Sequence, residues 1–360
     1  MRIAHISTQY SWRGGEQQIY YLHEELSDKN IDSIVLAKKN SEITSRIKSR
    51  GLSLEEFSFR SAYDLSTAWR IKSYANDQKV DLVHAHTAKA HTLAVFAALF
   101  GMKAKIIVSR RVDVPVKNNW FSRYKYNHSG VSSIICVSEK IKEITGERIK
   151  DSDKLRTVYS GVDLKKFQNI ERGRLRSQFA IKENYKIVGN ISALAEHKDL
   201  PTFLRTAKRL LAEKTNLKFV IVGEGKERAA IEKMIVELDL KGKVILTGFR
   251  KDIPEILADI DVFLFTSKTE GLGTTILDAL ASGTPVVATR AGGVPEIIEK
   301  DGAGILSAIG DVESLASNVK SILDNQEIRK SIIEKGFQTA KTFSKTVTAE
   351  KTLNLYQALL

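Results

Sequence analysis

The segment from Ser267 to Asp278 combines glycines and acidic residues in an order suited to a phosphorylated sugar. Gly271 and Gly273 precede an apolar, helix-like run, and glycines at a helix start let backbone N–H groups approach an anion. Glu270 stands before this helix and Asp278 about one turn inside it, so both carboxylates could accept hydrogen bonds from sugar hydroxyls. The same spacing also fits an ordinary helix N-terminus with a favourable acidic residue.

A second glycine turn, Gly14-Gly15-Glu16, follows the first predicted strand and opens a helix. It lacks the Gly-x-Gly-x-x-Gly pattern of dinucleotide-binding proteins, and no acidic residue ends the second strand as a ribose ligand. Taken alone, this turn fits either an anion-binding loop or a plain turn.

Histidines and the cysteine give no metal prediction. His84 and His86 share one face of a predicted strand and His91 lies on the next helix, but no carboxylate or thiolate nearby completes a ligand shell. We therefore expect no bound metal. The single cysteine, Cys136, cannot form an intrachain disulfide and is predicted to be an inert core residue.

The elements that must position these residues alternate along the whole chain. Apolar, β-branched runs predict strands at Arg2–Ser7, Asp32–Leu36, Asp81–His86, Lys105–Ser109, Ser133–Val137, Arg156–Tyr159, Lys186–Ile191, Lys218–Val222, Lys243–Thr247, Val262–Thr266 and Pro285–Ala288. Amphipathic stretches predict helices between them, for example at Glu16–Ser27, Thr67–Asn76, Pro201–Glu213 and Glu227–Leu238, and a wholly helical chain after Asp311. Continuous apolar strands separated by helices predict parallel sheets covered on both faces, hence two doubly wound α/β domains. Ligands of such domains bind at loops after the strands.

Charge is distributed unevenly over the 360 residues. The formal net charge is +13, and most of the basic excess lies in the first half, which favours an anionic partner such as a phosphorylated substrate, an anionic membrane leaflet or nucleic acid. The basic residues between Arg110 and Tyr126 alternate with Trp120, Phe121 and Tyr124. This stretch fits an interfacial contact with anionic lipid, or a loop and helix with core aromatics and solvated cations.

No signal peptide is predicted at the N-terminus, and apolar runs such as Thr92–Phe100 are too short to span a bilayer. We therefore expect a cytoplasmic protein, with possible peripheral contact at the inner face of the membrane.

The segment Glu270–Asp278 resembles the Glu-x7-Glu element of the retaining glycosyltransferases of family 4, which have the two-domain GT-B fold. The resemblance extends along nearly the whole chain. It includes Gly14-Gly15-Glu16, Val137-Ser138-Glu139, Ser160-Gly161-Val162-Asp163 with Phe167, Glu196-His197-Lys198-Asp199, Gly223-Glu224-Gly225, Gly248-Phe249, Ala258–Val262 and Ala291–Glu296. One such motif would be weak, but this many in order are highly specific.

The resemblance implies a domain over residues 1–165 on the acceptor side, joined by a C-terminal helix at about 346–360. It also implies a nucleotide-sugar domain over 183–342, after a linker at Asp163–Lys182.

It further implies the role of each site residue. Lys198 would neutralise the donor diphosphate, and the amides of Gly271, Leu272, Gly273 and Thr274 would hold the phosphates and the sugar. Glu270 would bind sugar hydroxyls, Asp278 the ribose, Phe249 and Arg250 the nucleobase, and Gly15 would approach the diphosphate. Leaving-group charge would then be stabilised by Lys198 and a helix N-terminus rather than by a metal or other cofactor.

Three departures from the family pattern stand out. The second acidic residue is Asp278, where glutamate is usual. Ala193 stands where members of the family have a phosphate-binding arginine, and Arg250 or an arginine of the first domain could take over that role. Arg110 and Arg111 stand where members often place a sugar-contacting histidine, so that either could serve the acceptor or sugar side, with His86 beside the same cleft.

The predicted function is therefore transfer of a sugar, with retained configuration, from a UDP or GDP type of nucleotide-sugar to a glycan or lipid-linked acceptor. A role in cell-envelope polysaccharide or lipopolysaccharide biosynthesis is expected. The alternatives are a catalytically weak or inactive GT-B-derived binder of anionic lipid or nucleic acid, and a nucleotide-sugar epimerase. The aromatic and basic stretch would suit single-stranded nucleic acid, but the second domain would then have no role, so nucleic acid is not the expected partner.

Overall fold

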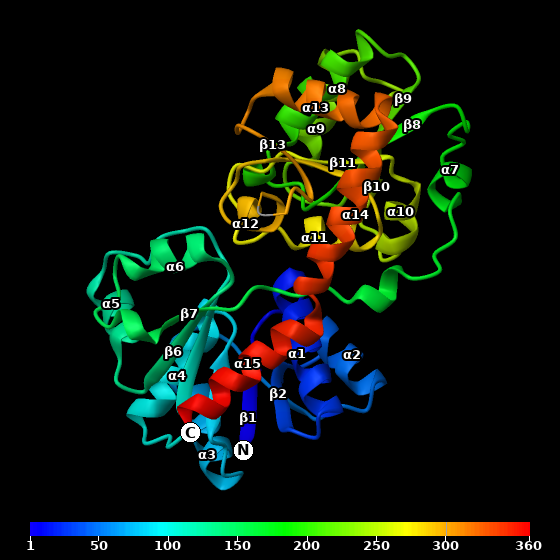
Figure 1. Ribbon diagram of the computed structural model, residues 1–360. Coiled ribbons are helices and arrows are strands. Elements are labelled where there is room, and N and C mark those ends of the chain that lie inside the picture. Colours follow the sequence, from blue (N-terminus) through cyan, green and yellow to red (C-terminus); the bar gives the residue numbers. More distant parts are fainter. Residues whose placement is uncertain (300) are drawn as a thin grey trace. The chain divides into compact units, whose positions relative to one another are not determined.

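The computed structural model describes residues 1–299 and 301–360 and divides into two compact units (Figure 1). Unit 1 comprises Met1–Gly161 together with Lys345–Leu360, and unit 2 comprises Val162–Ser344. The segment Asp163–Lys182, expected as a linker, packs within unit 2. Its amides at Gly173 and Leu175 donate to the buried Asp259 carboxylate at 2.5 and 2.7 Å.

Unit 1 contains a parallel sheet of seven described strands in the order β3-β2-β1-β4-β5-β6-β7. The strands are β1 (Arg2–Ser7), β2 (Asp32–Lys38), β3 (Leu54–Phe57), β4 (Leu82–Ala85), β5 (Lys105–Arg110), β6 (Val131–Cys136) and β7 (Leu155–Thr157). The helices are α1 (Gly14–Asp28), α2 (Glu42–Ser49), α3 (Leu65–Asp77), α4 (Ala88–Leu99), α5 (Trp120–Asn127), α6 (Glu139–Gly146), the 3₁₀ turn η1 (Ser152–Lys154) and α15 (Lys345–Leu359).

The C-terminal helix α15 completes the core of unit 1 by packing beside α1. Its Tyr356 is fully buried among Ile3, Leu82 and Ile107 of the central strands. Lys345, at its first turn, forms a 2.6 Å ion pair with the buried Glu24 of α1. Residues that are far apart in the sequence therefore build one hydrophobic core.

Unit 2 contains a parallel sheet of six described strands in the order β10-β9-β8-β11-β12-β13. The strands are β8 (Lys186–Ile191), β9 (Leu217–Val222), β10 (Val244–Gly248), β11 (Val262–Phe265), β12 (Val286–Thr289) and β13 (Gly304–Ser307). The helices are η2 (Leu164–Phe167), α7 (Arg174–Gln178), η3 (Glu196–Lys198), α8 (Leu200–Leu211), α9 (Arg228–Glu237), α10 (Ile253–Asp259), α11 (Thr274–Ala281), α12 (Val294–Ile298), α13 (Val312–Asp324) and α14 (Gln326–Thr342).

The predicted doubly wound α/β architecture is confirmed. Every strand pairing in both sheets is parallel, and the central strands β1, β4, β8 and β11 are almost wholly buried. Two edge strands were missed by the sequence analysis. β3 contains Glu55 and Glu56 and β13 begins at Gly304, so neither shows the apolar run of a central strand.

Candidate active site

The glycine loop that joins β11 to α11 forms the centre of the candidate site in unit 2. Gly273, the N-cap of α11, has φ +91°, a left-handed conformation that favours glycine, and offers no side chain to cap the helix. The amides of Thr274 and Thr275 have no backbone acceptor in the described chain. Unsatisfied N–H groups at a helix N-terminus attract anions, so this loop can hold a phosphate.

Lys198 and Glu270 form an ion pair at the mouth of this loop. Their side chains are only 17% and 12% exposed, and the Ser267 hydroxyl donates a second hydrogen bond to Glu270 at 2.8 Å. Lys198 ends η3 after β8, whereas Glu270 follows β11, the neighbouring strand. The order of the sheet reverses between these two strands, and such a switch point is where open α/β sheets bind ligands.

Two further contacts tie the β8–α8 loop to the β11–α11 loop. The Lys268 amide donates to the His197 carbonyl at 2.8 Å, and the Thr266 hydroxyl donates to the carbonyl of Lys198 at 3.2 Å. The loop after β9 packs against the same region. A Cβ atom at Gly225 would lie 2.2 Å from the Leu194 carbonyl oxygen, so only glycine fits there. Lys198 is therefore held by a rigid set of loops.

Asp278 lies on α11 and is half-buried, and the charge of Lys166 acts on its carboxyl group. No side-chain hydrogen bond to its carboxyl group is found in the described chain. Burial raises its pKa from the ordinary 3.8 to about 7, and the Lys166 charge opposes this rise only weakly. A carboxyl group that needs hydrogen-bond donors suits a ligand hydroxyl.

Phe249 and Arg250 behave differently from each other. Phe249 follows β10 and is 60% exposed, so its ring is available for stacking. Arg250 forms a bidentate pair with Asp252, at 2.8 and 2.5 Å, and also donates to Gln178. Ala193 lies exposed after β8. Arg250 is thus engaged, which argues against it as the replacement for the arginine missing at position 193.

In unit 1, Arg111 lies next to the glycine turn that begins α1. Its Cδ atom is 4.0 Å from the place a Cβ atom would take at Gly15. Its guanidinium donates to His86 at 3.2 Å and to Ser109 at 3.4 Å, and no carboxylate among the described residues lies within 4.0 Å of it. Burial lowers its pKa to about 10, so the side chain stays charged at neutral pH. Glu16, the nearest acid, has a pKa that burial raises.

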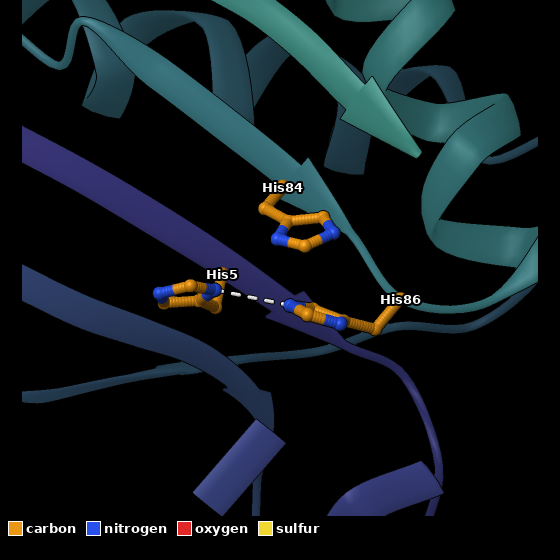
Figure 2. Close-up of side chains that lie close together, drawn as sticks. All are labelled: His5, His84 and His86. Carbon is orange, nitrogen blue, oxygen red and sulfur yellow. Dashed lines mark hydrogen bonds between the residues drawn. The ribbon is translucent and has the colours of Figure 1, made fainter. Parts of the chain in front are cut away.

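Three buried histidines, His5, His84 and His86, form a cluster (Figure 2). Arg111 contacts it through His86. His5 Nδ1 and His86 Nε2 are 3.0 Å apart, while His84 bonds to Tyr356 at 2.5 Å on one side and to the Ser109 hydroxyl on the other. Burial lowers the pKa of all three, that of His5 to about 3, so they are neutral at pH 7.

One ring nitrogen from each histidine lies within 4.8 Å of the others, which is close enough to hold a metal ion. Most of these nitrogens already serve hydrogen bonds, and the neighbouring Arg111 cation disfavours a second positive charge. Hydrogen bonding therefore accounts for the cluster. The sequence analysis grouped His91 with His84 and His86, but His91 bonds instead to the Lys125 carbonyl. It missed His5 and Tyr356, which no local pattern connects.

Among the described residues, no helix is long and apolar enough to cross a membrane.

The two units, each built on a parallel Rossmann-like sheet, have the GT-B fold. Two family models match the chain. "Glycosyltransferase Family 4" matches residues 12–166, and "Glycosyl transferases group 1" matches residues 171–339. The chain belongs to glycosyltransferase family 4.

Curated relatives agree with this assignment, and a solved structure shares the fold. The N-acetyl-alpha-D-glucosaminyl L-malate synthase of Bacillus anthracis is 26% identical over 82% of this chain and 78% of its own length. The UDP-Gal:alpha-D-GlcNAc-diphosphoundecaprenol alpha-1,3-galactosyltransferase of Escherichia coli is 25% identical over 78% of each chain. The Anabaena HepE structure with UDP and glucose has a TM-score of 0.84 at 19% identity and covers 100% of both chains.

Proposed function

We propose that this glycosyltransferase moves a sugar from a UDP or GDP type of nucleotide-sugar to a glycan or lipid-linked acceptor, with retained configuration and without a metal. The observation that carries the proposal is the Lys198–Glu270 pair at the glycine loop before α11. A single cluster in unit 2 thus offers a cation, a carboxylate and unsatisfied helix N–H groups. These are the groups that a sugar diphosphate needs.

In this proposal the bond between the sugar and the diphosphate breaks, the acceptor hydroxyl oxygen forms the new bond to the sugar, and the hydroxyl proton passes to a phosphate oxygen of the departing nucleoside diphosphate. The departing nucleoside diphosphate gains negative charge, which Lys198 and the amides of Gly271 to Thr274, Leu272 included, stabilise. Glu270 orients the sugar hydroxyls, Asp278 accepts from the ribose, and the exposed Phe249 stacks on the base. The Glu270 partner also holds the Lys198 ammonium in position before the donor binds.

The acceptor proposal draws on the relatives. The Escherichia coli relative is named for a diphosphoundecaprenol-linked acceptor, and another, 26% identical, from Rhizobium meliloti for lipopolysaccharide core biosynthesis. We propose an envelope polysaccharide or lipopolysaccharide acceptor, a cytoplasmic location and peripheral contact with the anionic inner face of the membrane. The exposed aromatics of unit 1, Trp69 and Trp120 among them, support such a contact.

The test is a thermal-shift series with UDP-, GDP-, ADP- and CMP-sugars in metal-free buffer. One nucleotide class is expected to raise the unfolding midpoint of the wild type, and the rise is expected to disappear in Lys198→Ala. Lys233→Ala, which removes an exposed lysine on α9 of unit 2, serves as the control. If no nucleotide-sugar shifts the midpoint, the proposed donor site is refuted.

A further inference from the structure

Three basic residues at the end of β5, in the loop after it and on α5 have no acidic partner among the described residues. We call Arg110, Lys117 and Lys125 the basic cluster. No carboxylate among the described residues lies within 4.0 Å of any of them. Some largely buried cations in the chain have an acidic partner, such as Lys345 with Glu24 and Lys198 with Glu270, whereas Arg111 lacks one among the described residues. A lysine as deeply buried as Lys125 is rare without a paired acid.

Lys125 forms the floor of the basic cluster and is only 8% exposed. Its ammonium makes two long hydrogen bonds, to the Thr92 hydroxyl at 3.3 Å and to the Ala88 carbonyl at 3.5 Å. It also lies 5.5 Å from the centre of the Tyr126 ring. These neutral contacts hold the ammonium in place but do not neutralise it.

Arg110 lies over the same ring, with its guanidinium carbon 5.8 Å from the Tyr126 centre. One terminal nitrogen donates to the Val114 carbonyl, while Nε is buried and has no hydrogen-bond partner. Lys117 is exposed, and Arg110 is half-buried. The basic cluster therefore reaches from the surface to the buried Lys125.

The electrostatics show that these charges act on one another. Burial first, and then the charges of Arg110 and Lys117, together lower the pKa of Lys125 to about 8. The neighbouring His91 has its pKa lowered by burial, then by Lys125, so it stays neutral and adds no counter-charge. A bound anion would relieve this repulsion.

Exposed aromatic side chains lie on α5, the helix that carries Lys125, but on another face of it. Trp120 and Tyr124 lie four residues apart on α5, are 78% and 42% exposed, and share a helix with Lys125. Tyr63 is 66% exposed and contacts Phe121, the residue after Trp120, at 5.8 Å between ring centres. Tryptophan and tyrosine are typical of the membrane interface, where one end of a ring is wet and the other apolar.

We propose that the basic cluster binds the phosphate groups of a lipid-linked acceptor, while the exposed aromatics of α5 meet the lipid chain. This inference rests on the lipid-linked acceptor of the proposed function. Arginine and lysine are the side chains that grip phosphate, and the anion supplies the counter-charge that the chain itself lacks. These aromatics favour a lipid diphosphate over a free anion.

The experiment measures binding of a water-soluble, short-chain prenyl diphosphate to the full-length protein by calorimetry. Lys125→Met and Arg110→Gln are each expected to weaken binding about tenfold or more, because each removes one charged hydrogen-bond donor. Lys39→Met, which removes an exposed lysine elsewhere in unit 1, is the matched control and is expected to bind like the wild type. The same losses are expected in a Lys198→Ala background, because the candidate donor site lies in unit 2.

Vesicles of phosphatidylglycerol without diphosphate distinguish the two sources of phosphate. If the variants lose vesicle binding but keep prenyl diphosphate binding, the cluster serves lipid headgroups and the proposal is overturned. Equal losses in Lys39→Met would show non-specific attraction and overturn it as well. Donor binding that depends on Lys198, with unchanged prenyl diphosphate binding in the cluster variants, would refute this inference and leave the donor function standing.

To exclude misfolding, the unfolding midpoint of Lys125→Met is measured without any anion. Because the substitution removes a buried, unpaired ammonium and keeps an unbranched side chain, this variant is expected to be at least as stable as the wild type. Loss of prenyl diphosphate binding in a protein of undiminished stability then reports on the basic cluster itself.

Discussion

Asp278→Asn is expected to stabilise unit 2, and to do so more strongly as the pH rises. The native carboxyl group holds its proton up to about pH 7, whereas the unfolded chain releases it near 3.8. Between these values the native state binds more protons, so this group makes the protein less stable as pH increases. Asparagine has nearly the same shape and no charge, and it removes that penalty.

The magnitude follows from the pKa values. One pKa unit corresponds to about 1.4 kcal/mol, so a rise from 3.8 to about 7 sets an upper limit of about 4 kcal/mol above neutral pH. Because Asp278 is half-buried and solvent screens part of the effect, we expect the advantage of the variant to grow by about 2 kcal/mol between pH 5 and pH 8.

The assay is urea unfolding at pH 5, 6, 7 and 8, followed by far-UV circular dichroism. The three tryptophans, Trp12, Trp69 and Trp120, all belong to unit 1, so their fluorescence reports that unit separately and is expected not to change. Asp239→Asn, at an exposed position of unit 2, is the control. If Asp278→Asn and the wild type differ by the same amount at every pH, the carboxyl group is not held neutral by burial and the reasoning fails.

Four further predictions concern transfer chemistry and packing. Lys198→Ala is expected to lower kcat about 10²- to 10³-fold in a transfer assay while its far-UV circular dichroism spectrum matches that of the wild type. The activity of the wild type in excess EDTA is expected to match its activity in buffer. Wild-type turnover in the variant, or loss of wild-type activity with the chelator, would contradict the metal-free mechanism. Tyr356→Phe is expected to cost about 1–3 kcal/mol in urea unfolding because His84 loses a buried hydrogen bond, and an unchanged midpoint would show that this bond contributes nothing. Gly225→Ala is expected to lower the thermal midpoint of unit 2, since the new Cβ would lie 2.2 Å from the Leu194 carbonyl oxygen. Because Gly225 has no positive φ, the variant tests the steric clash alone, and an unchanged midpoint would refute it.

The sequence by itself determines the features that depend on local pattern. Apolar runs separated by amphipathic stretches specify both parallel sheets, and the glycine loop from Gly271 to Gly273 predicts a helix N-terminus that the structure contains. Lys198 and Glu270 were named from their motifs, and the structure brings them together. These features are readable because periodicity and glycine placement act over a few residues.

Only the tertiary structure decides which partner each charged group finds. Arg250 pairs with Asp252 and is thus unavailable, whereas Arg111 meets His86 and the turn at Gly15 across separate strands. The link between His84 and Tyr356 spans 272 residues, a separation that no local pattern encodes. The same holds for Lys125, which has no carboxylate within 4.0 Å among the described residues, because a missing long-range contact leaves no trace in sequence. Burial, which sets the charge state of Asp278, is likewise a property of the packed core and not of the helix that carries it.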